Sequence, residues 1–161
     1  MIGAVSTFQI ALLLHVFGVI VMLGGILTAG LAYYAAKRRA RPSEIAAILS
    51  LSRWGVLVGA IGFAWTTGFG LWLVHIARFS YTDPWLVAVY ALFGTSNALG
   101  AVTGAVPKRA RLLAERLAGE DDRPADELRR LLNHRPSEAL NHLSTLLMLA
   151  VLVLMVWRPG S

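Results

Sequence analysis

Four long apolar stretches alternate with charged segments along the chain. They cover about residues 8–36, 46–77, 84–106 and 138–157. Each stretch has at least the roughly 20 residues that a helix needs to cross about 30 Å of hydrocarbon. A helix also pairs its backbone polar groups within one segment, as lipid requires. The pattern predicts an all-α fold, a bundle of four transmembrane helices in a single membrane domain over residues 1–161.

The composition agrees with this class. Hydrophobic residues make up 57% of the chain, which is above the apolar share of a typical soluble domain. Residues 1–9 contain no Lys or Arg and precede an apolar run that is too long for a secretion signal, so we expect an uncleaved first span. Cysteine is absent, which excludes a disulfide framework and a thiolate metal site.

The basic residues are unevenly distributed between the two sides of the predicted bundle. All but two of the 15 lie between spans one and two, just inside span two, or between spans three and four. They are Lys37, Arg38, Arg39, Arg41, Arg53, Lys108, Arg109, Arg111, Arg116, Arg123, Arg129, Arg130 and Arg135; the exceptions are Arg78 and Arg158. The positive-inside rule places both basic loops in the cytoplasm and both termini outside. The net charge of +6 therefore reflects topology, and we expect lipid rather than nucleic acid as the partner.

The second cytoplasmic loop, about residues 107–137, carries two helix signals. They are "PKRARLLAERLAG" and "RPADELRRLLN", each with a proline at its start and leucines at helical spacing. We expect short amphipathic helices here. The insert is interpreted as a solvated spacer, or as a surface that meets lipid headgroups or a partner.

Two glycine pairs lie at four-residue spacing within the spans. Gly55 and Gly59 belong to the second span, and Gly100 and Gly104 to the third. Because lipid supplies no hydrophobic force between helices, small residues favour close backbone approach. We expect these faces to pack within the bundle, or else to contact other membrane subunits.

His15 lies within the apolar run "LLLHVFGVIVMLGGIL". An ionisable side chain at that depth is costly, and it marks a functional site or a buried hydrogen bond between helices. At about 100° per residue His15 shares a helix face with Gly18 and Met22, which leaves room beside the ring. His75, near the outer end of span two, is predicted at similar depth and could supply a second metal ligand.

Several segments resemble a bacterial family of small four-span membrane proteins of unknown function. They are "LLLHVFGVIVMLGG", "TTGFGLWL", "DPWLVAVYALF" and "PKRARLL". That family is distantly similar to HemJ-type protoporphyrinogen oxidases and CopD-type copper-resistance proteins. The resemblance implies a cytoplasmic (inner) membrane location and makes His15 a ligand of haem b. The lysine that HemJ-type proteins use in a later span has no counterpart, because Lys37 and Lys108 lie at helix ends.

The resulting hypothesis is a b-type haem protein with an electron-transfer or redox role near the external face. Its cofactor-binding residues would be His15, His75, Gly18 and Met22, with His15 and His75 on the metal. No nucleophile and base pair, phosphate loop or carboxylate pair is found, so no catalytic residue is assigned and enzymatic activity is left open. The alternatives are a proton pathway, copper handling by His15 and Met22, or a cofactor-free accessory or assembly subunit.

The topology is directly testable with fusions. A reporter that is active only outside the cytoplasm should work when fused after Ser161 and fail when fused within residues 119–124, because the basic loops retain the second site inside. The opposite pattern of activity would overturn the orientation.

Overall fold

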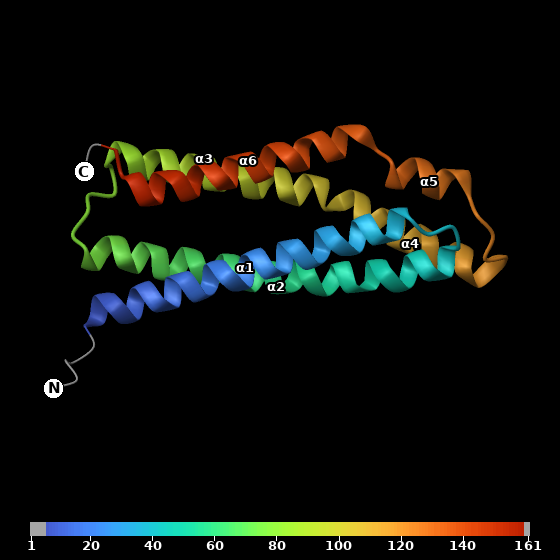
Figure 1. The fold of residues 1–161 in the computed structure, drawn as a ribbon, viewed down its shortest axis with the longest axis horizontal. Helices are drawn as coiled ribbons and strands as arrows, with labels where there is room; N and C mark the ends of the chain where they lie inside the picture. The colour runs from blue at the N-terminus through green and yellow to red at the C-terminus, as the bar shows by residue number, and fades with distance from the viewer. Residues whose placement is uncertain (1–5, 160–161) are drawn as a thin grey trace. The chain divides into compact units, whose positions relative to one another are not determined.

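The computed structural model describes residues 6–159. The described chain is helical and contains no strand (Figure 1). The helices are α1 (Thr7–Lys37), α2 (Pro42–Ile76), α3 (Pro84–Thr103), α4 (Ala105–Glu120), α5 (Asp126–Leu132) and α6 (Arg135–Trp157). Four helical stretches are long and apolar enough to cross a membrane, and they begin at Thr7, Pro42, Pro84 and Asp126. The predicted all-α fold with four spans is confirmed.

The chain divides into two compact units, and each is described by itself. The first contains α1 up to Ala36 together with residues 47–80. The second contains residues 37–46 and the chain from Tyr81 onward. The beginning of α2 therefore belongs to the second unit and the rest of α2 to the first.

In the first unit α1 and α2 run antiparallel with their backbones in contact. A Cβ added at Gly25 would lie 2.3 Å from the backbone nitrogen of Gly59 and 2.6 Å from the carbonyl oxygen of Gly55. A Cβ at Gly55 would lie 2.7 Å from the backbone nitrogen of Ala29. Glycine at these positions permits the two helix backbones to approach this closely. The expectation that Gly55 and Gly59 pack within the chain is confirmed.

The second unit joins α3 and α6 by a reciprocal pair of serines. Ser96 Oγ donates to the carbonyl oxygen of Ser144 at 2.9 Å, and Ser144 Oγ donates to that of Ser96 at 3.0 Å. The two helices run side by side in opposite directions (Figure 1). Such side-chain hydrogen bonds hold helices together where lipid offers no hydrophobic force.

The insert forms α4 and α5, as predicted, but it is more than a solvated spacer. Ala110 and Ala114 of α4 and Leu128 and Leu132 of α5 are buried. The two helices contact each other, and the leucine spacing of the sequence indicated the buried leucines of α5 but not the buried alanines of α4.

The turn after α4 also reaches the beginning of α2. Asp122 accepts a hydrogen bond from the Ser43 backbone N–H at 2.8 Å and another from the Ser43 hydroxyl at 2.7 Å. The carboxylate thereby caps a helix N-terminus from 79 residues away, where a negative charge is favourable. We call this contact the Ser43–Asp122 clamp.

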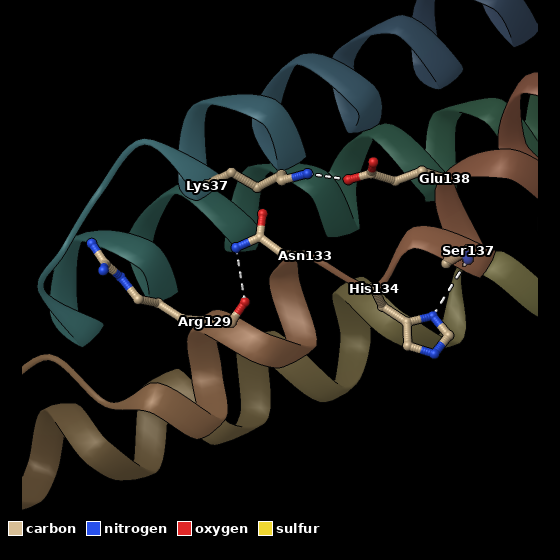
Figure 2. Close-up of polar contacts among 6 residues, drawn as sticks. All are labelled: Lys37, Arg129, Asn133, His134, Ser137 and Glu138. Carbon is tan, nitrogen blue, oxygen red and sulfur yellow. Dashed lines mark hydrogen bonds and ion pairs between the residues drawn. The ribbon is translucent and has the colours of Figure 1, made fainter.

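Further polar contacts lie near the start of α6 (Figure 2). Lys37 forms an ion pair with Glu138. His134 is the N-cap of α6, where its Nδ1 accepts a hydrogen bond from the Ser137 backbone N–H at 3.4 Å. The side chain of Asn133 donates to the carbonyl oxygen of Arg129 at 3.0 Å and so closes the end of α5.

The glycine contact predicts a stability difference between neighbouring positions. Gly25→Ala should lower the free energy of unfolding in detergent by about 1–3 kcal/mol, because the new methyl group forces the backbones apart. Gly24→Ala is the matched control, since nothing lies within 4 Å of its added Cβ. Equal stability of the two variants in denaturant titration would contradict the observed register of α1 and α2.

The Ser43–Asp122 clamp predicts a pH dependence at the beginning of α2. The hydrogen bonds from the Ser43 hydroxyl and backbone, together with the charge of Arg41, lower the pKa of Asp122 below its usual value. Because the folded pKa is depressed, the clamp contributes at pH values above the usual aspartate range and is lost as pH falls through the folded pKa. The protection factor of the first turn of α2, which is exchange corrected for the intrinsic pH dependence of amide exchange, should therefore fall on acidification. In the Asp122→Asn variant the first turn of α2 should be less protected at neutral pH, and its protection should no longer depend on the titration of residue 122.

Candidate functional site

His15 is buried between α1 and α2, with 8% of its surface exposed. Its Nδ1 lies 2.9 Å from the backbone carbonyl oxygen of Thr66. A carbonyl oxygen can only accept, so Nδ1 must carry a hydrogen and donate it. In the neutral ring the lone pair is then on Nε2, which has no hydrogen-bond partner within residues 6–159.

A second hydrogen bond crosses the same two helices in the opposite sense. Trp65 Nε1 donates to the carbonyl oxygen of Leu14 at 3.0 Å. Leu14 and His15 on α1 thus exchange side-chain to backbone bonds with Trp65 and Thr66 on α2. We call this arrangement the α1–α2 clasp. The sequence offered no signal for it, because its partners are 51 residues apart.

The face expected to leave room beside His15 is filled by α2. A Cβ added at Gly18 would lie 2.8 Å from the backbone nitrogen and the hydroxyl oxygen of Thr66. Met22 is buried, and its backbone nitrogen would lie 2.3 Å from a Cβ at Gly62. Gly18 and Gly62 let the two helices approach each other, so no open groove is left along this face. A direct cofactor contact by Gly18 or Met22 stays a prediction.

The structure does not bring His75 to His15. His75 is exposed in the last turn of α2, five residues beyond Gly70. At about 100° per residue it faces roughly 140° away from Gly70, and Gly70 is the position that meets the His15 ring. His75 as a second metal ligand therefore stays a prediction.

Two further polar side chains lie on the predicted third and fourth spans. Asn97 Nδ2 donates to the carbonyl oxygen of Phe93, one turn earlier in α3, at 2.7 Å. His142 is exposed on α6. No group of three or more His, Cys, Asp or Glu residues that could hold a metal ion is found in the described part of the chain. A haem, by contrast, takes only one or two protein ligands.

An aromatic row that the sequence analysis missed flanks the clasp. Trp65 meets Phe17 of α1 edge-on, with ring centroids 6.3 Å apart, and lies 5.2 Å from Phe69, which in turn is 5.9 Å from Trp72. Trp65, Phe69 and Trp72 are spaced by four and three residues, which places them on one face of α2. This spacing was the available signal.

The fold and the buried intramembrane histidine define the class, an all-α, four-span integral membrane protein. The chain belongs to the family described as predicted integral membrane protein (DUF2269), whose family model matches residues 9–159. No curated protein and no solved structure matches the chain. The resemblance to HemJ-type and CopD-type proteins stays a prediction.

Proposed function

We propose that this protein binds a b-type haem through Nε2 of His15 and has an electron-transfer or redox role near the external face of the cytoplasmic membrane. The observation that carries the proposal is the hydrogen bond from His15 Nδ1 to the Thr66 carbonyl oxygen. Metal-ligating histidines almost always donate their other ring N–H to a carbonyl or carboxylate, which fixes the ring and raises the basicity of the ligating nitrogen.

The cost of burying an imidazole supports a functional role. His15 lies within α1, the most hydrophobic of the four candidate spans, and its side chain is buried against α2. Ionisable residues inside membrane spans are rare and mark functional sites by default. The hydrogen bond to Thr66 satisfies one ring nitrogen and leaves the other with an unused lone pair.

The donor set suits a haem that takes one protein ligand, His15, with a second left open. His15 would hold the iron, which would supply one-electron redox chemistry when bound. If His75 completed the coordination, two imidazoles would favour electron transfer over oxygen binding. The external location follows from the predicted topology, because His15 is eight residues after the first residue of α1.

A cofactor-free accessory or assembly subunit is the alternative. The hydrogen bond from His15 would then serve packing alone. Gly55 and Gly59 are occupied by α1, so the partner surface would lie on the third span, where nothing approaches within 4 Å of a Cβ added at Gly100. Gly104, at the junction of α3 and α4, belongs to the same four-residue pattern.

An absorption spectrum separates the two functions. Protein purified gently from haem-replete cells should show a Soret band that shifts on reduction, and His15→Ala should abolish it. His15→Asn is the informative variant, because its amide retains an N–H donor for the Thr66 carbonyl but cannot replace Nε2 as a ligand.

His142→Ala is the matched control, and it should retain the band. His75→Ala should change the spin state if His75 is the second ligand and should have no effect if it is not. A colourless wild-type protein, or a Soret band that survives both His15 substitutions, would rule out haem binding by His15.

A further inference from the structure

The second span determines which nitrogen of His15 is available. Thr66 occupies Nδ1 through its backbone carbonyl, as described above, and Gly70 lies one turn further along α2. A Cβ added at Gly70 would come within 3.0 Å of His15 Cε1 and 3.1 Å of Nδ1. The ring therefore lies against the backbone of α2 so closely that a Cβ at position 70 would require the ring to shift by a few tenths of an ångström.

We infer that Gly70 and Trp65 are positioning residues that keep the Nδ1–H of His15 bonded to Thr66 and so leave a lone pair on Nε2. The site then binds an electron-pair acceptor at Nε2. The acceptor class comprises a metal centre, such as a haem iron, and a polar N–H or O–H group. Only the choice of iron within this class rests on the proposed function.

Gly70 acts by leaving out a methyl group at the ring. Glycine within a helix lowers helix stability relative to alanine. Gly68, two residues earlier, is the comparison, because nothing lies within 4 Å of its added Cβ. Alanine at position 70 would push the ring away from α2 and lengthen the bond from Nδ1 to the Thr66 carbonyl. The proton would then shift toward Nε2, which would remove the lone pair from that nitrogen.

Trp65 acts by fixing the axial position of α1 relative to α2. Its bond to the Leu14 carbonyl and the His15 bond to the Thr66 carbonyl join adjacent residues on each helix. The edge-on contact with Phe17, one turn after Leu14, restrains the indole further. Loss of the indole N–H would leave the His15 bond as one half of the clasp and allow α1 to slide along α2.

The same arrangement excludes a class of ligand. A carboxylate or a quinone carbonyl would need an N–H at Nε2, and the Nδ1–H tautomer has none there. The neutral site therefore does not bind hydrogen-bond acceptors through its imidazole.

Nitrogen NMR of the full-length protein in lipid nanodiscs tests the tautomer without any ligand. With ¹⁵N-labelled histidine at mildly alkaline pH, His15 should show a protonated Nδ1 and an unprotonated Nε2. Gly70→Ala should shift the population toward Nε2–H, whereas Gly68→Ala should leave it unchanged. A wild-type His15 with its proton on Nε2 overturns the inference even if the variants do not fold.

Titration with ferric protoporphyrin IX tests the consequence for binding. Gly70→Ala and Trp65→Phe should weaken the affinity by roughly 10- to 100-fold, the range for partners that orient a metal-ligating histidine. Trp72→Phe, in the same aromatic row but outside the clasp, and Gly68→Ala should bind as the wild type does. Equal affinity of all four variants would overturn the roles of Gly70 and Trp65.

The two measurements separate this inference from the proposed function. An Nδ1–H tautomer that depends on Gly70, in a protein that binds no porphyrin, supports the inference and rejects the haem. Porphyrin binding that requires His15, in a protein whose free Nε2 carries the proton, supports the haem and rejects the inference.

Discussion

The contact between the backbones of α1 and α2 is the constraint on which the rest of the first unit depends. Water provides no driving force inside a bilayer, so two helices gain stability only by bringing many atoms into van der Waals contact and by forming interhelical hydrogen bonds. Gly25, Gly55 and Gly62 remove the side chains that would prevent this approach. The register that results brings Gly18 opposite Thr66 and His15 opposite Gly70.

The chemistry of His15 follows from that register. A carbonyl oxygen inside a helix is normally engaged by the amide four residues later, but it has two lone pairs and can accept a second hydrogen bond. His15 uses this capacity on Thr66, and Trp65 uses it on Leu14. The helices must be close for either bond to form, so the glycine contact and the state of the imidazole are physically linked. An imidazole that is anchored on one nitrogen keeps the lone pair of the other, which is the basis of the ligand role proposed for His15.

The second unit is organised by polar contacts between distant segments. Ser96 and Ser144 join two spans by exchanging hydrogen bonds, and the Ser43–Asp122 clamp joins the insert to the beginning of α2. In both cases a short polar side chain forms a hydrogen bond with a backbone group on another helix. Asp122 also adopts a positive φ of 48°, which aspartate tolerates better than most residues. The insert is thus attached to the beginning of α2 by specific hydrogen bonds.

The sequence by itself determined the helical class, the number of spans and the two short helices of the insert. Span length, proline position and leucine spacing are local properties, because each helix forms its backbone bonds within its own segment. It also identified His15 as the unusual residue. The tertiary structure alone decided that Gly18 and Met22 face α2 rather than an open groove, that His75 lies on another face, and that Asp122 reaches Ser43. These features depend on the rotation and register of helices far apart in the chain, and periodicity specifies a helix face without specifying what meets it.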